Sequence, residues 1–356
     1  TNNNTLRSRS SAHGIAWNLG DLYSSINDPK IDADLDDAET RAGEFANLHK
    51  GCLKLLRASA FADAISEFER ICELADTPVI FASLLHAAKS DDPKRGKLLA
   101  HVTERNSVIR NTLIFFELEW TALEEEQARK LMQAPTTHKY AHFLQKERRF
   151  KPHKLSEAEE KLLEQKSNTG SRAFSRLFDE LTGRLVCEVS IDGQTRRLNE
   201  SEALALLYDP QRKTRRAAAE AITVTLNEQS HLLTYVMNTL VQDHKIDGQL
   251  RSYSSPMASR NLANEIDQRS VDSLIQSCVS AYPTVHRFYE LKKRLLGYDK
   301  LYDYDRYAPI SEDSPECDWD RCKLIVRDAY ASFAPEAAEI VDKFFEGNWI
   351  DAELRP

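Results

Sequence analysis

Glycine and proline are scarce in this chain. Only 11 Gly and 12 Pro occur among its 356 residues. The sequence contains no G-x-x-x-x-G-K-[ST] phosphate loop, no G-x-G-x-x-G fingerprint and no G-x-S-x-G elbow. These absences exclude the nucleotide-binding and serine-hydrolase sites that depend on such motifs. Few chain breakers, together with 29% charged residues, favour long helices over many-stranded sheets.

Closely paired cysteines are also missing. The six cysteines form no C-x2-C pair, so neither a disulfide framework nor a zinc knuckle is indicated. Cys317 and Cys322 lie five apart, and this spacing favours unrelated thiols over a redox pair, which needs the tighter C-x-x-C turn. We therefore expect a reducing compartment, the cytoplasm.

The sequence lacks a basic stripe and a long apolar run. The net charge is -8 and Lys and Arg are spread throughout, which disfavours nucleic-acid binding. No run approaches about 18 apolar residues, and the opening TNNNTLRSRSSAHG lacks the apolar region of a secretory signal. We therefore expect neither a membrane span nor export, and we expect residues 1–16 to be disordered or frayed.

Helical periodicity dominates what is present. Apolar residues recur at three- and four-residue spacing through 61–74, which predicts a helix with one buried stripe. Thr77 and Pro78 form a typical N-cap and first-turn pair, and they predict that a new helix starts there. A very long helix is expected over 94–132, and a shorter one over 137–150.

One β signal interrupts the helices. In RLVCEVSIDGQTRRL (184–198), alternating apolar residues flank Asp192-Gly193, the dipeptide that supplies the positive φ angles of a type I′ turn. A two-stranded hairpin is predicted here. Asn199, with Glu202 three residues later, then predicts a capped helix.

The hairpin divides the chain into two predicted parts. We expect 17–198 to form an N-terminal helical lobe that ends in the hairpin, and 199–356 to begin a second helical region. In the first part, Ser156 and Glu159 form a capping box, and in the second one long helix is expected over 210–247. No repeat of about 34 or 40 residues is present, which argues against a solenoid. The predicted fold class is mostly α.

The histidines of HKYAH suggest a metal site. His138 and His142 lie four apart, the spacing at which one helical face offers two imidazoles to an ion. Lys139, however, stands where the Glu of a zinc-peptidase HExxH motif would act as general base, and its cation would repel a dication. The pair could at most form a structural site that needs two more ligands, and His153 is the one nearby candidate. Surface or interhelical histidines are the favoured interpretation.

Two further stretches invite a functional reading. Asp303 and Asp305 lie two apart on a stretch expected to be extended, so their carboxylates would share one face. Such a pair can perform acid-base chemistry, but in a Tyr-rich loop the favoured reading is a set of hydrogen-bond acceptors. Residues 248–267 form a long polar segment rich in Ser, Asn and Arg, and such loops are often functional.

Four stretches together resemble one family, oligoendopeptidase F and its thimet-oligopeptidase-like relatives. WNLGDLY (17–23) is similar to the family's opening, and FLQKERRFKPHKLSEAEEKLL (143–163) to its charged helical hairpin. ELKKRLLGYDKLYDYDRYAPI (290–310) is similar to the segment that leads into its catalytic core. FFEGNWIDAELRP (344–356) is similar to the approach to the strand beside its active site. Two departures bear on subgroup assignment only: Asn18 stands where the family often has Asp, and Arg306 where it often has Leu.

The resemblance implies a helical zinc metallopeptidase that encloses short peptides in a deep channel. It also implies one zinc ion, held by the two His of HExxH and a Glu further on. This chain contains no HExxH, so the resemblance places the metal ligands and catalytic residues beyond Pro356 and none of them in this segment. We therefore expect 199–356 to be the first part of the catalytic lobe, and the chain alone to be inactive without a C-terminal catalytic portion.

Four residues are candidates for contacts with a peptide in that channel. Arg260 could pair with a peptide carboxylate, Asn261 lies beside it, and Tyr304 and Tyr307 could donate to peptide carbonyls. The alternative is that the two tyrosines pack at a junction between lobes and that Arg260 caps a helix. The rival to a peptidase is a non-enzymatic helical module that binds peptides or proteins in its grooves.

Overall fold

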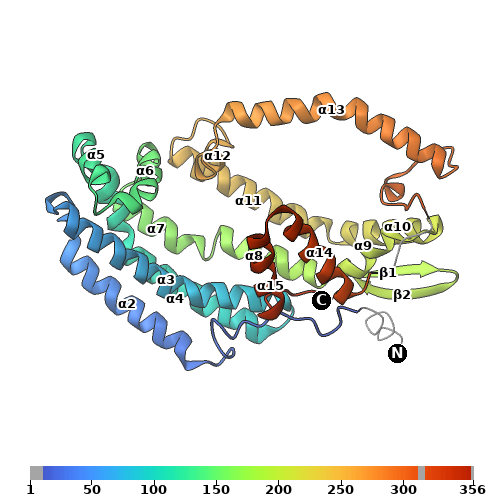
Figure 1. Ribbon diagram of the computed structural model, residues 1–356, viewed down its shortest axis with the longest axis horizontal. Coiled ribbons are helices and arrows are strands. Elements are labelled where there is room, and N and C mark those ends of the chain that lie inside the picture. The colour runs from blue at the N-terminus through green and yellow to red at the C-terminus, as the bar shows by residue number, and fades with distance from the viewer. Residues whose placement is uncertain (1–10, 312–316, 354–356) are drawn as a thin grey trace.

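The computed structural model describes residues 11–311 and 317–353, and most of these residues lie in helices (Figure 1). The described part contains one two-stranded antiparallel sheet. The fold class predicted from the sequence, mostly α with one hairpin, is confirmed. Residues 1–10, which belong to the terminus expected to be frayed, lie outside the described residues.

The elements of the first half are the helices of the N-terminal core, two further helices and the hairpin. In chain order they are α2 (Pro29–His49), α3 (Ala58–Ala88), α4 (Pro93–Ala122), α5 (Glu125–Gln133), α6 (Ala141–Arg149), α7 (Glu157–Ser167), α8 (Ser171–Gly183), β1 (Val186–Ile191) and β2 (Gln194–Asn199). The second half contains α9 (Glu200–Ala205), α10 (Arg212–Glu228), α11 (Ser230–Leu250), α12 (Ala258–Ala263), α13 (Gln268–Leu295), α14 (Trp319–Phe333) and α15 (Pro335–Glu346).

An aromatic core holds α2, α3 and α4 together. Phe116 stacks on Phe68 with ring centroids 4.7 Å apart, and Phe45 of α2 lies 5.5 Å from Phe116. Phe61 and Trp120 extend the cluster, with centroids 5.3 Å apart. Because buried aromatic rings each remove a large apolar area from water, this cluster stabilises the bundle of α2, α3 and α4.

The helix expected to start at Thr77 and Pro78 does not exist as a separate element, so that prediction is wrong. Instead, α3 runs unbroken through Pro78. The Thr77 hydroxyl donates to the Glu73 carbonyl at 2.7 Å, a bond made inside a helix rather than at its start. Proline inside a helix costs about 3 kcal/mol. Burial of Ala75 and Phe81 on either side offsets that cost and keeps the helix continuous.

The very long helix expected over 94–132 is also interrupted. It ends at Ala122, Leu123 is extended (φ -54°, ψ 144°), and α5 begins two residues later. Arg148 of α6 donates to the carbonyls of Trp120 and Leu123, each at 3.1 Å. The Arg148 guanidinium thus donates to carbonyls that have no partner within the helix end. Because Arg148 is distant in sequence, the local pattern around residue 122 could not predict this contact.

The hairpin follows the sequence prediction closely. Asp192 and Gly193 both have positive φ, 52° and 76°, and join β1 to β2. Asn199 and Glu202 form the expected capping box at the start of α9. The buried face of the hairpin packs against α9 and α10, and this packing connects the sheet to the second half of the chain. The helix expected over 210–247 is divided at Gln229 into α10 and α11.

One described helix, α3, is long and apolar enough to cross a bilayer by length and composition alone. It packs against both α2 and α4, and its apolar side chains make up much of the shared core. The core helix of a bundle has the same composition, because it is apolar on more than one face.

We expect Phe116→Ala to lower the free energy of unfolding of the N-terminal bundle by about 3–5 kcal/mol, because it leaves a cavity among the stacked rings. Val108→Ala in the same helix is the control, since Val108 is 46% exposed. Its cost should stay below about 1 kcal/mol. Urea unfolding followed by circular dichroism measures both, and equal losses would show that the aromatic core does not dominate stability.

Candidate functional site

A buried ion pair fixes the segment between α13 and α14. Asp305 and Arg215 are both 0% exposed, and Arg215 Nη2 lies 2.9 Å from Asp305 Oδ1. Arg212 adds a second contact, Nη2 to Asp305 Oδ2, at 2.7 Å. The extended segment predicted here is wrong: Asp303–Asp305 form the 3-10 helix η5, so Asp305 points inward while Asp303 stays exposed. The two carboxylates therefore do not form an acid-base pair.

Neighbouring backbone groups make further hydrogen bonds to both charged side chains of this ion pair. The Tyr302 amide donates to Asp305 at 3.0 Å, and Arg215 donates to the Asp209 carbonyl at 2.7 Å. Burial raises the pKa of Asp305, but the bonds from Arg212, the Tyr302 amide and Arg215 outweigh burial and hold it below its usual range. The carboxylate is therefore a structural anchor for the cations around it.

Tyr304 and Tyr307 lie on either side of this anchor. The Tyr304 ring is half-buried and stacks on Tyr302 with centroids 5.3 Å apart. Tyr307 is 41% exposed and stacks on Tyr208 at 4.6 Å. Both rings thus pack at the junction with α10 and η4 (Leu206–Tyr208), and the Arg306 guanidinium lies over the Tyr307 ring, 4.9 Å from its centroid.

Arg260 and Asn261 lie in α12, a short helix inside the polar segment that the sequence suggested to be a loop. The Asn261 side chain is buried, and its Nδ2 donates to Gln268 Oε1 at 2.8 Å. Arg260 is exposed, and its guanidinium has no hydrogen-bond or ion-pair partner within 11–311 and 317–353. Asn261 therefore shapes the turn into α13, whereas Arg260 is free to bind an anion.

The structure does not bring the two pairs of candidate residues together. Arg260 and Asn261 precede α13, and Tyr304 and Tyr307 follow it (Figure 1). At 1.5 Å per residue, the 28 residues of α13 extend over roughly 42 Å. A short peptide could contact one pair or the other.

The two histidines of HKYAH do not share a helix. His138 lies in the 3-10 helix η2 (His138–Tyr140), and His142 lies in α6. His142 Nε2 lies 3.0 Å from Glu265 Oε1, and Arg149 reaches the other oxygen of Glu265 at 3.3 Å. These contacts join α6 to the turn between α12 and α13.

No zinc site is assembled in the part of the chain that the structure describes. It contains no group of three or more His, Cys, Asp or Glu side chains placed to hold a metal ion. His153, the third candidate ligand, instead stacks on Tyr253 with centroids 3.9 Å apart and bonds the Arg251 carbonyl at 2.8 Å. These residues do not fit a zinc ion.

A second ionic joint, which no sequence pattern predicted, lies between Arg251 and Glu160. Arg251 makes two parallel bonds to Glu160, at 2.7 and 2.9 Å, and a third to Asp247 at 2.8 Å. The hydrogen bonds that Arg251 donates to the Glu160 carboxylate raise the pKa of Arg251. This bidentate pair joins α7 to the end of α11 and positions the segment that carries α12.

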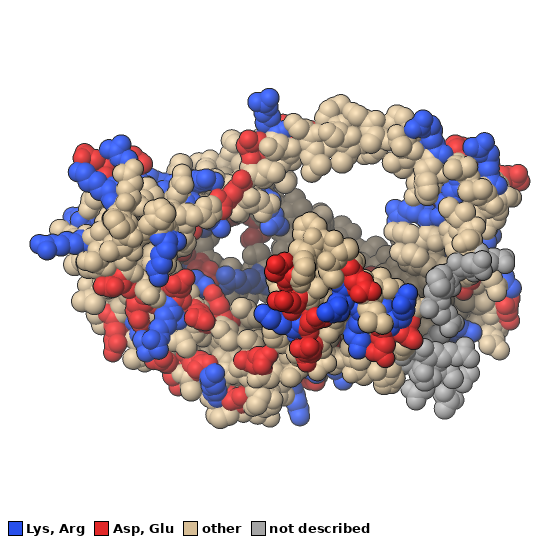
Figure 2. Space-filling view, in the orientation of Figure 1, with Lys and Arg blue, Asp and Glu red and all other residues tan. Residues whose placement is uncertain are grey.

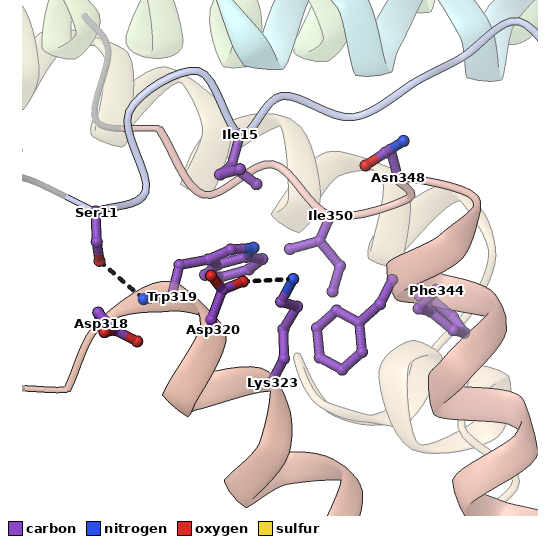
Figure 3. A pocket seen from close by; sticks show the side chains of 10 residues that line it. Ser11, Ile15, Asp318, Trp319, Asp320, Lys323, Phe344, Asn348 and Ile350 are labelled. Carbon is purple, nitrogen blue, oxygen red and sulfur yellow. Dashed lines mark hydrogen bonds and ion pairs between the residues drawn. The ribbon is translucent and has the colours of Figure 1, made fainter.

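The N-terminal segment and the segment after α15 form a clasp. The Asn18 amide donates to the Asn348 carbonyl at 2.6 Å, and the Trp349 indole donates to Asp21 at 2.9 Å. Beside the clasp lies a cavity of about 430 Å³, and Figure 3 shows Trp319 and Lys323 of α14 and Ile350 lining it. Lys323 pairs with Asp320 at 2.8 Å. The lining includes none of the four candidate peptide contacts.

Two family models match the chain. The model described as Oligopeptidase F matches residues 119–186, and the model for peptidase family M3 matches residues 205–318. Group B oligopeptidase PepB of Streptococcus agalactiae is 26% identical over 278 residues, which cover 77% of this chain and 46% of that protein. An oligoendopeptidase F homolog of Lactococcus lactis is 23% identical over 343 residues, covering 95% of this chain and 56% of that protein.

The crystal structure of oligoendopeptidase-F from Enterococcus faecium has the same fold. It superposes with a TM-score of 0.73 at 22% identity, covering 88% of this chain and 66% of that one. The chain thus spans about half the length of the curated relatives that it matches.

We expect Asp305→Asn to lower the free energy of unfolding by about 3–5 kcal/mol, because it leaves the buried Arg215 cation without its partner. Asp303→Asn, two residues away and exposed, is the control and should cost less than about 1 kcal/mol. Thermal and urea unfolding measure both.

The same pair of variants tests pH dependence. The folded-state pKa of Asp305 lies below the unfolded value of about 3.9. Its carboxylate therefore stabilises the fold above that pH, and the stabilisation is lost as pH falls through the folded-state pKa. Between pH 6 and pH 3 the native chain should lose more stability than Asp305→Asn. Parallel losses would contradict an ionised anchor.

Proposed function

The chain belongs to the oligoendopeptidase F family, and on that basis we propose that the complete protein is a zinc-dependent endopeptidase of short peptides. The matches to both family models, in order along one chain, carry this proposal. In it, residues 17–198 are the N-terminal lobe and 199–356 the first part of the catalytic lobe. Together they supply walls of the channel that encloses the peptide.

The zinc ion belongs, in this proposal, to the half of the relatives' length that this chain does not span. The described residues contain no cluster of three or more His, Cys, Asp or Glu side chains placed to hold a metal ion, so no catalytic step is assigned to them. When bound, zinc would polarise the scissile carbonyl and activate a water molecule. The contribution of this chain is to bind and orient the peptide and to exclude larger substrates.

Arg260 is the strongest of the four candidate contacts. Its guanidinium is exposed and unpaired within the described residues, so it can form a charge-assisted bond with a peptide carboxylate. Tyr307 keeps an exposed ring beside Tyr208 and can donate its hydroxyl to a peptide carbonyl. Because Tyr304 is half-buried and Asn261 bonds Gln268, these two would act mainly by holding their neighbours.

The partners of the complete protein follow from the same proposal. They are short peptides and the C-terminal catalytic portion, with neither nucleic acid nor membrane, in the cytoplasm. A net charge of -8 with dispersed Lys and Arg is consistent with the absence of a nucleic-acid surface.

We expect the 356-residue chain to hydrolyse no quenched-fluorescent peptide, with or without added zinc. A polypeptide extended by its own reading frame to the relatives' length should hydrolyse it and contain one zinc per chain by elemental analysis. An extended frame without HExxH and a downstream Glu would instead support the non-enzymatic peptide-binding module. Zinc bound stoichiometrically by the short chain would contradict the proposed division of roles.

In the extended protein we expect Arg260→Ala to raise KM by about 10- to 100-fold with little change in kcat, since a charge-assisted bond contributes about 1.5–3 kcal/mol. The increase should vanish for peptides with an amidated C-terminus, which lack the carboxylate. Arg269→Ala, an exposed neighbour at the start of α13, is the control. An equal effect on both kinds of peptide would remove Arg260 from the site.

A further inference from the structure

Two exposed tyrosine rings beside the buried anchor are in contact with a guanidinium. Tyr307 stacks on Tyr208 with ring centroids 4.6 Å apart and planes inclined by 20°. The Arg306 guanidinium lies over the Tyr307 ring, 4.9 Å from its centroid. Tyr208 is 59% exposed and Tyr307 is 41% exposed, so this arrangement lies at the surface. We call these three residues the Arg306 stack.

The guanidinium of the stack makes no ion pair. Arg306 is exposed, and in the described part of the chain its guanidinium forms no hydrogen bond and contacts no carboxylate. Contact with a ring face leaves the N–H donors of a guanidinium available, and it limits the positions that the long side chain samples. The guanidinium is therefore open to a ligand with two acceptor oxygens, such as a carboxylate.

The buried anchor next to the stack has more positive than negative charge. Asp305 pairs with Arg212 and Arg215, and no other described carboxylate pairs with either cation. Lys292 is 5% exposed, and its ammonium donates to the Arg306 carbonyl at 2.7 Å without pairing with any described carboxylate. One negative charge thus meets three positive charges in the segment that leads into the stack.

This surplus of positive charge favours a bound anion. Buried cations without a counter-ion are costly, and a bound anion offsets that cost. Figure 2 shows that the molecule is open beneath α13, and blue Lys and Arg side chains gather at the end of this opening where the segment after α13 meets α10 (Figure 1). The chain as a whole has a charge of -8, so its surface repels a polyanion while this local region attracts a small anion.

We propose that the Arg306 stack binds a carboxylate of the peptide substrate and gives the complete protein a preference for acidic peptides. The inference rests on the proposed function, because it takes a short peptide as the ligand. The guanidinium donates two parallel hydrogen bonds to the carboxylate, and the rings of Tyr208 and Tyr307 contact the apolar atoms next to it.

The carboxylate can belong to an Asp or Glu side chain of the peptide or to its free C-terminus, because both offer the same pair of oxygens. Arg260, the other unpaired candidate, precedes α13, whereas Arg306 follows it. The length of that helix separates the two guanidinium groups, so they do not bind the same carboxylate. The experiment therefore presents the two kinds of carboxylate on different peptides.

Equilibrium binding to the extended protein tests the stack without reference to peptidase activity. Zinc is removed with a chelator so that no peptide is cleaved. Three heptapeptides of Gly and Ala carry fluorescein at the N-terminus: one has a central Glu and an amidated C-terminus, one has a central Gln and an amidated C-terminus, and one has a central Gln and a free C-terminus. Fluorescence anisotropy should show that the Glu peptide binds at least about 10-fold more tightly than the uncharged Gln peptide, as expected for a charge-assisted contact.

Variants of the extended protein locate the contact. Arg306→Ala should remove the advantage of the Glu peptide and leave the affinity for the uncharged peptide unchanged. Arg306→Lys keeps the charge but not the two parallel donors, and it should restore only part of the advantage. Lys300→Ala is the matched control, because Lys300 is an exposed cation that lies over a different ring, 4.9 Å from the centroid of Tyr302. It should keep most of the advantage, and circular dichroism should show the same melting temperature for all of these proteins.

Two outcomes would overturn the proposal. One is equal affinity of the native protein for all three peptides. The other is an equal loss in Arg306→Ala and Lys300→Ala, which would make the general positive field responsible and not the stack. A gain that depends on Arg306 but is confined to the peptide with a free C-terminus would uphold the site and identify the peptide terminus as its ligand. Binding of the Glu peptide through Arg306, without hydrolysis of any peptide after zinc is restored, would refute the proposed function and leave the binding site intact.

Discussion

The buried pair of Arg215 and Asp305 is the constraint on which the second half of the molecule depends. It joins α10, which packs on the hairpin, to the short helix that follows α13. Arg212 and Lys292 gather around the same segment, so one carboxylate is approached by three cations. Burial and the nearby Arg215 lower the pKa of Lys292. Burial of Asp305 and Arg215 is possible because each charge has hydrogen-bonded partners. A single buried charge without a partner would strongly destabilise the fold.

Two parts of the chain are therefore held together by different kinds of interaction. The N-terminal bundle is held by stacked aromatic rings that exclude water. The helices from α11 to α13 are positioned by discrete polar joints, Arg251 with Glu160 and His142 with Glu265. Polar joints fix position without covering apolar surface, and so large apolar side chains remain exposed in this region.

Features set by neighbouring residues were predictable from the sequence. Asp192-Gly193 can form only a few kinds of turn, and the boxes at Ser156 and Asn199 are made within one helical turn, so all three were found. The continuation through Pro78 was missed because tertiary packing overrides a local start signal. The mostly α fold was likewise legible in the helical periodicity and in the scarcity of glycine and proline.

Joints between distant residues were not predictable. Arg148 ends α4 from 25 and 28 positions away, and Asp305 lies 90 positions from Arg215. No spacing rule in the sequence links such distant partners. Asp303 and Asp305 therefore looked equivalent in the sequence, although only Asp305 is buried. Arg260 and Tyr307 were candidates because of the chemistry of their side chains. The sequence did not show that α13 would hold them far apart.

The clasp between the two ends of the described chain has a consequence in time. Asp21 and Trp349 are 328 residues apart, yet they share a hydrogen bond. At a synthesis rate of about 5–20 residues per second, roughly 15 to 65 seconds separate their appearance on the ribosome. The N-terminal bundle is complete in sequence long before that. The contacts that the segment around Trp17 makes with Asn348 and Trp349 can form only after the polypeptide has been made up to Trp349.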